Sequence, residues 1–243
     1  MFSLVLLAAA LLGFAVMARV LMVWRKHPSN LLLFTVIALG GVALQTLLAG
    51  LGRQLGAGAE LRDWYAIPSL ISVFAVPFTL FTHATLCRRI GFAWARIDWG
   101  HGTLCLIAVA LLINGLREVP VLRLLQPGCW QDVVWYQHAV ATDLLCAGAD
   151  AGAALSLPPL ALLVAMAAWA GLGLGMRQQR PGYAAAMTVA IGLLALAPLI
   201  DAWVGPLAWF VGQLLGFAAI AVLSADFALL LATRPAEDAD ESA

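Results

Sequence analysis

Charged residues are scarce in this sequence of 243 residues, which contains 13 Lys and Arg, 13 Asp and Glu, and a hydrophobic share of 63%. Soluble domains carry a charge on about a quarter of their residues, so this composition excludes a soluble globular fold. So few basic residues, with a net charge of zero, also exclude a nucleic-acid partner. The sequence therefore predicts a multi-pass protein whose first partner is the lipid bilayer.

Lysine, histidine and cysteine are rare as well, and their positions exclude several kinds of site. The single lysine, Lys26, follows an apolar segment, which excludes a retinal Schiff base in the core. The four histidines show no ligand spacing, and no Cys-x-x-Cys pair occurs, so we expect no metal and no cofactor. Because no acid, base and nucleophile set can be named, an enzyme is the least favoured class.

Long apolar segments are what the sequence has in abundance. Seven of them approach the 20 or so residues that cross a bilayer: Phe2 to Trp24, Leu31 to Leu51, Ala66 to Cys87, Trp99 to Leu116, Leu157 to Met176, Tyr183 to Val204 and Leu207 to Thr233. We predict an all-α fold, in which residues 1–234 form one domain with seven transmembrane helices. The acidic residues 235–243 are expected to be a disordered tail.

The basic residues predict the orientation of this bundle. If the N-terminus is outside, eight of them lie on the cytoplasmic side: Arg25, Lys26, Arg88, Arg89, Arg96, Arg177, Arg180 and Arg234. Four then lie outside: Arg53, Arg62, Arg117 and Arg123. This bias predicts an outer N-terminus and a cytoplasmic C-terminus, as in a protein of the bacterial inner membrane.

The only long interval of mixed polarity is the extracytoplasmic stretch 116–157. An eighth span over Val133 to Gly152 would bury Asp143 and Asp150 at about 2 to 3 kcal/mol for each charge. Its apolar residues follow a helical period, so we predict instead an interfacial helix between the fourth and fifth spans. The side chains that it offers for binding outside are Trp130, Trp135, Tyr136 and His138.

Two of the four cysteines, Cys129 and Cys146, also fall in this stretch. An oxidising outer compartment would permit a disulfide between them, which would close a loop over the interfacial helix. Two free thiols are the alternative.

Polar groups inside the spans are candidates for function. Near the cytoplasmic ends of their helices lie Arg19, His83 and Asp226. A pair of Asp226 with Arg19 or His83 would reduce the cost of burying the charge, and a titrating His83 beside the carboxylate could gate or relay a proton. The alternative is that these residues only hold neighbouring helices together. A second layer near the outer side contains Gln45, Asn114, Asp201 and Gln213, which would suit either a polar vestibule or ordinary interhelical hydrogen bonds.

These observations lead to two hypotheses about function. The first is a small permease or channel-like transporter of a polar solute or ion, with a path between the two polar layers. The alternative is a membrane sensor or assembly subunit that binds a ligand, a partner membrane protein or a second copy through residues 116–157. In topology alone the plan resembles two unrelated groups, the sugar transporters built from two helix triplets around a single helix and the seven-helix sensory modules of bacterial histidine kinases. Neither group contributes a residue assignment.

Overall fold

A computed structural model describes residues 1–118, 125–137, 146, 160–197 and 205–233 of the chain. These residues are mostly helical. The helices are α1 (Phe2–Lys26), α2 (Asn30–Leu55), α3 (Ala59–Ile90), α4 (Ala93–Arg96), α5 (Asp98–Glu118), α6 (Leu160–Gly175), α7 (Pro181–Leu196) and α8 (Gly205–Thr233). The predicted tail, residues 235–243, lies outside the described residues.

Five of these helices, α1, α2, α3, α5 and α8, are long and apolar enough to cross a membrane. Helices α6 and α7 are also apolar, but each has 16 residues in the described part of the chain. The prediction of a helical membrane protein is thereby confirmed. The count of seven spans and the outer N-terminus stay predictions.

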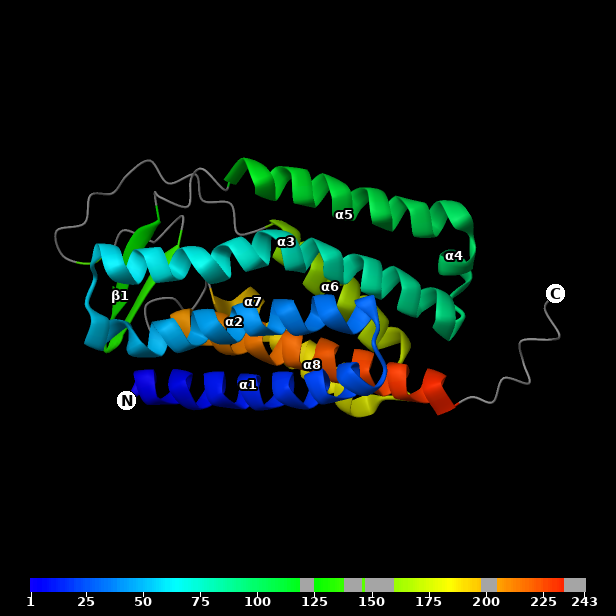
Figure 1. The fold of residues 1–243 in the computed structure, drawn as a ribbon, viewed down its shortest axis with the longest axis horizontal. Helices are drawn as coiled ribbons and strands as arrows, with labels where there is room; N and C mark the ends of the chain where they lie inside the picture. Colours follow the sequence, from blue (N-terminus) through cyan, green and yellow to red (C-terminus); the bar gives the residue numbers. More distant parts are fainter. Residues whose placement is uncertain (119–124, 138–145, 147–159, 198–204, 234–243) are drawn as a thin grey trace.

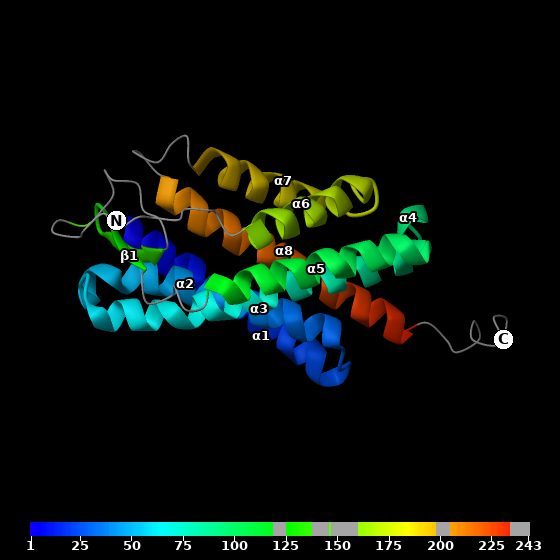
Figure 2. The same ribbon diagram turned by 90° about the horizontal axis from the view of Figure 1, so that it is seen from above.

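The long helices lie side by side along one axis (Figures 1 and 2). Helix α2 packs against α1, α3 and α8, while α5 lies at the edge and packs mainly against α3. One end of the bundle carries the N-terminus and two short strands, and we name it the hairpin end. The opposite end, which we name the basic end, carries the ends of α1 and α3, the short helix α4 and the α6–α7 turn.

The helix ends follow from local sequence. Helix α1 stops at Lys26 because Pro28 follows, and the N–H of His27 closes the last turn on the carbonyl of Val23. Helix α3 stops at Gly91, whose φ of 98° is left-handed and favours glycine. Its N–H donates to the carbonyl of Cys87 at 3.1 Å, which satisfies one of the free carbonyls at the end of the helix.

The prediction of an interfacial helix from Val133 is wrong for residues 133–137. There the chain forms strand β2 (Val133–Gln137), which pairs antiparallel with β1 (Gln126–Trp130). The reason is local preference, because two valines, a tryptophan and a tyrosine in succession favour a strand over a helix. A two-residue turn at Gln131 and Asp132 joins the strands, and Gln131 takes a left-handed φ of 53°.

The core consists of two clusters of buried apolar side chains. The larger cluster runs through the bundle and includes Leu39, Trp169 and Phe217. The smaller one lies at the hairpin end, where the hairpin packs on residues of α1, α2, α3 and α8. The hairpin is therefore part of the hydrophobic core rather than an appendage on the surface.

Candidate functional site

The aromatic residues predicted to bind outside, Trp130, Trp135 and Tyr136, are buried, with 6%, 3% and 4% of their surface exposed. The ring of Trp130 lies 4.7 Å from that of Phe2 in α1, and Tyr136 lies 5.9 Å from Tyr65 in α3, measured between centroids. They fill the hairpin end of the bundle instead of forming an exposed aromatic belt. The fourth candidate, His138, is outside the described residues.

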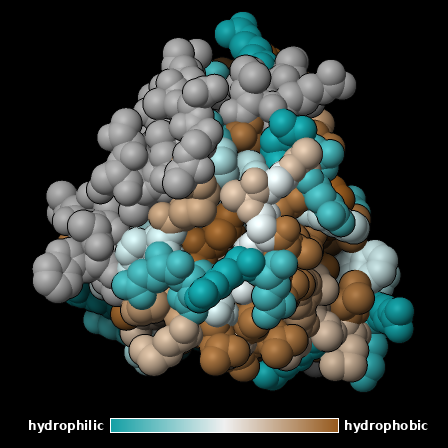
Figure 3. Space-filling model, turned by 90° about the vertical axis from the view of Figure 1, so that its left-hand side faces the viewer, coloured by the Kyte–Doolittle hydropathy of each residue, from teal (hydrophilic) through white to brown (hydrophobic). Residues whose placement is uncertain are grey.

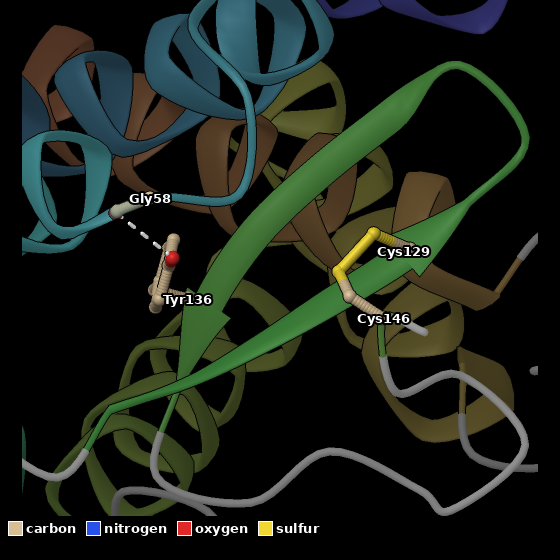
Figure 4. Close-up of a disulfide and its surroundings, with 4 residues drawn as sticks. All are labelled: Gly58, Cys129, Tyr136 and Cys146. Atoms are coloured by element: carbon tan, nitrogen blue, oxygen red, sulfur yellow. Dashed lines mark hydrogen bonds between the residues drawn. A yellow bond between two sulfur atoms is a disulfide. The ribbon is translucent and has the colours of Figure 1, made fainter. Parts of the chain in front are cut away.

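Two close contacts fix the hairpin onto the helices. Gly52, in the last turn of α2, lies against β2 so closely that a Cβ atom there would stand 2.1 Å from the carbonyl oxygen of Val134. The hydroxyl of Tyr136 also donates a hydrogen bond of 3.0 Å to the carbonyl of Gly58, the residue that precedes α3 (Figure 4). The hairpin thus contacts both ends of the α2–α3 connection.

A disulfide joins Cys129 of β1 to Cys146, with their Cα atoms 4.8 Å apart (Figure 4). The backbone N–H of Cys146 also donates to the carbonyl of Pro127 at 3.2 Å. These two contacts attach the chain after β2 back to β1.

Asp132, in the turn of the hairpin, ties it to the start of α1. Its Oδ2 atom accepts hydrogen bonds from the Met1 amino group, from the N–H of Ser3 at 3.2 Å and from the hydroxyl of Ser3 at 2.9 Å. The bond from the amino group, helped by those from Ser3, holds the pKa of the Asp132 carboxyl well below its usual range. The carboxylate is therefore ionised at any ordinary pH.

Seen from the hairpin end, the surface carries hydrophilic side chains next to exposed hydrophobic ones (Figure 3). The exposed residues Arg53 and Gln54 in the last turn of α2, and Glu60 and Asp63 in the first two turns of α3, lie at this end. The hairpin contributes fewer exposed side chains, since Gln131 is the one exposed residue among 125–136.

The predicted inner layer is not assembled as expected. Asp226 of α8 pairs with Arg180, at the start of α7, at 3.0 Å between Nη1 and Oδ2. Arg19 lies on an exposed face of α1, and no ion pair involves it within the part of the chain that the structure describes. The structure therefore places Asp226 in an ion pair between α7 and α8, and not in a pair with Arg19 or His83.

His83, the third member of that layer, is buried in an aromatic and thiol environment. Its ring centroid lies 5.2 Å from that of Trp169 and 6.2 Å from that of Trp94, and the Sγ atom of Cys87 is 3.6 Å from its Nε2 atom. These contacts of His83 involve no carboxylate of a described residue. Packing is therefore the role that these contacts support.

The outer amide layer is not gathered around one space either. Gln213 of α8 is buried, Gln45 of α2 is half-buried, and Asn114 is exposed on the peripheral helix α5. Asp201 lies outside the described residues. Asn114 therefore cannot share a vestibule inside the bundle with Gln213.

The structure contains a pocket of about 400 Å³ at the basic end, between the α1–α2 turn, α3 and α8. Its polar lining consists of His27, Ser29, Thr82, Arg89 and Ser224. Its apolar lining consists of Pro28, Leu86, Phe227 and Ala228. None of the six described residues predicted for the two polar layers lines it.

The sequence contained a partial signal for this pocket. Arg89 entered the prediction of orientation through its charge alone, and no prediction involved Thr82 or Ser224. A threonine and an arginine seven residues apart occupy the same face of α3, which is the pattern that could have suggested a polar groove there.

Within the described ranges, no three His, Cys, Asp or Glu side chains are grouped as the ligands of a metal ion would be. Comparison with protein-family models, with curated proteins and with solved structures finds no match for this chain.

Proposed function

We propose that this membrane protein is a sensor, in which events at the hairpin end change the shape of the basic end, rather than a permease. The observation that supports this most is the burial of Trp130, Trp135 and Tyr136 among the ends of four helices. Buried aromatic side chains transmit displacement well, because a packed core does not deform without moving its neighbours.

The same helices connect the two ends. The hairpin packs on α2, α3 and α8, and the pocket at the basic end is bounded by the start of α2 and by side chains of α3 and α8. A helix behaves as a nearly rigid rod, so a tilt imposed at one end displaces the other. Movement of the hairpin would therefore alter the pocket.

A permease would need a polar path between these ends. Between Thr46 and Thr35 on α2, the buried side chains are apolar, and they include Leu39 and Val42. Between Gln213 and Ser224 on α8, the buried side chains are likewise apolar, and they include Phe217 and Ile220. In the described core this apolar layer separates the pocket from the hairpin, which favours sensing over transport.

The test uses Cys87, a buried thiol near the basic end. With Cys105→Ser in place, and Cys129 bonded to Cys146, Cys87 is the only free thiol of the chain. We expect Trp135→Ala at the hairpin end to raise the rate of Cys87 alkylation about 10-fold. This corresponds to a decrease of about 1.4 kcal/mol in the free energy of the local opening that exposes Cys87.

The matched control is Trp64→Ala, which removes the same side chain from an exposed position on α3 near the hairpin end. It should leave the alkylation rate of Cys87 unchanged. Equal rates in the two variants would show that the hairpin is not coupled to the basic end. Independently, liposomes containing the protein should release trapped potassium, chloride and glucose no faster than empty liposomes, and a saturable protein-dependent flux would overturn the proposal in favour of a permease.

A further inference from the structure

The pocket at the basic end is lined by a serine whose hydroxyl has no hydrogen-bond partner among the described residues. Ser224 of α8 lines the pocket with 6% of its surface exposed, and its hydroxyl oxygen is buried without a hydrogen-bond partner among the described residues. Buried hydroxyls are almost always hydrogen-bonded, because leaving one unpaired is costly. The unpaired hydroxyl therefore points to a ligand or a solvent molecule as its partner.

The charges around this hydroxyl favour an anion. Arg89 of α3 lines the pocket and forms no ion pair in the described part of the chain, whereas its neighbour Arg88 pairs with Asp98 at 3.7 Å. The nearby carboxylate, Asp226, is already engaged by Arg180. Among the described residues, no carboxylate therefore forms an ion pair with the guanidinium of Arg89.

The backbone adds to this positive character. His27, Pro28 and Ser29 line the pocket and directly precede Asn30, where α2 begins. The N-terminus of an α-helix carries a partial positive charge of about half a unit and attracts phosphate in particular. A guanidinium, a hydroxyl and a helix N-terminus together are the donors that proteins use for phosphate groups.

The other half of the pocket is apolar, since Leu86 and Phe227 line it. A volume of about 400 Å³ lies within the range of small-molecule sites and leaves room for carbon atoms next to an anion. From these features, we propose that the pocket binds the phosphate group of a phosphate ester, with Arg89 and Ser224 as its ligands and the ester carbons against Leu86 and Phe227. The ester could be the headgroup of a phospholipid or a soluble molecule. This proposal does not depend on the sensor function.

The experiment measures binding to the full chain in nanodiscs. Calorimetry with glycerol 3-phosphate tests a soluble ester, with glycerol as the probe that lacks phosphate. Native mass spectrometry of protein exchanged between phosphatidylcholine and phosphatidylglycerol tests a lipid headgroup. Saturable binding in the first arm assigns a soluble ester, and retention of phosphatidylglycerol in the second assigns a lipid.

Arg89→Gln should weaken binding in the positive arm by roughly 10-fold or more, because it removes a charge-assisted hydrogen bond. Ser224→Ala, which removes only the hydroxyl, should weaken it roughly 3-fold to 10-fold. The matched control is Arg88→Gln, which removes the same charge from the adjacent position outside the pocket and should leave binding within about 2-fold.

Three results would overturn the assignment. One is the absence of saturable binding in both arms. Another is an equal loss in Arg88→Gln and Arg89→Gln, which would show attraction to the basic surface rather than to the pocket. The last is full binding by each of the two single variants, Ser224→Ala and Arg89→Gln, since neither donor would then contact the phosphate.

Discussion

The close approach of α2 to the hairpin gives a sharp prediction for Gly52→Ala. A Cβ atom at this position would lie 2.1 Å from the carbonyl oxygen of Val134, and 2.9 Å from its carbonyl carbon. Because these are backbone atoms, no side-chain rotation can relieve the clash, and either α2 or β2 must shift. Gly52→Ala should therefore weaken the docking of the hairpin.

The magnitude follows from two opposing effects. Overpacking of a core costs about 1 to 3 kcal/mol, while alanine favours a helix interior over glycine by about 1 kcal/mol. Since the clash is with backbone, we expect a net loss of about 1 to 2 kcal/mol in the free energy of docking. That loss increases the population of the undocked hairpin about 5-fold to 30-fold.

The Cys129–Cys146 disulfide reports this population, because reduction requires access to a bond whose Cys146 half is buried. The assay is the rate of reduction by a phosphine, followed on gels after the new thiols are labelled with a maleimide carrying polyethylene glycol. The control is Gly102→Ala in α5, where an added Cβ meets nothing within 4 Å. Equal reduction rates in the two variants would refute the reasoning.

Three further predictions concern single contacts. Tyr136→Phe removes the hydrogen bond to Gly58 and should lower the free energy of unfolding by about 0.5 to 1.5 kcal/mol, measured by thermal denaturation in detergent. The pKa of Asp132 is lower in the folded protein than in the unfolded chain, so its ionised form contributes stability above about pH 4 and loses it as the pH falls further. Asp132→Asn should remove that part of the acid dependence, and an unchanged acid-unfolding curve would contradict this assignment. Asp226→Asn breaks the pair with Arg180. Because the side chains of Arg180 and Asp226 are 37% and 39% exposed, the variant should lower the free energy of unfolding by less than about 1 kcal/mol. A larger loss would contradict this weak structural role.

The helices were predictable from the sequence because long apolar segments have few alternatives in a membrane. Their ends were less so. Helix α3 begins at Ala59, about two turns before the predicted Ala66, since Glu60, Arg62 and Asp63 look like loop residues but form helix outside the apolar layer. The length of an apolar segment therefore predicts how much of a helix lies in the membrane, whereas the helix itself can be longer.

The hairpin was missed because its turn carries no glycine or asparagine. The two residues between the strands are Gln131 and Asp132, whereas two-residue turns usually contain Asn-Gly or Asp-Gly. Without that signal, the helical spacing of Val133 with Val140 and Leu144 was the stronger pattern. The strand preference of Trp135 and Tyr136 decided the outcome when β1 was available to pair with them.

The pocket could not be derived from the sequence for a different reason. Its donors come from three separate segments, and the rotation of each helix about its axis decides which side chains meet. The same holds for Asp226, which was grouped with Arg19 and His83 from its position near the end of its apolar segment. Its partner is Arg180, which the sequence analysis counted only as a basic residue on the cytoplasmic side.

The peripheral position of α5 has a consequence for how this protein tolerates change. Trp99, Leu106 and Ile113, spaced seven residues apart, are 72%, 69% and 51% exposed and form one outward stripe. If the surrounding acyl chains are their only neighbours, any large apolar residue should serve equally well there, whereas the shape of each side chain matters on α2. A library of substitutions should therefore distinguish two kinds of helix in this chain. On α5 any large apolar residue should be tolerated, whereas on α2 only side chains of a suitable shape should be.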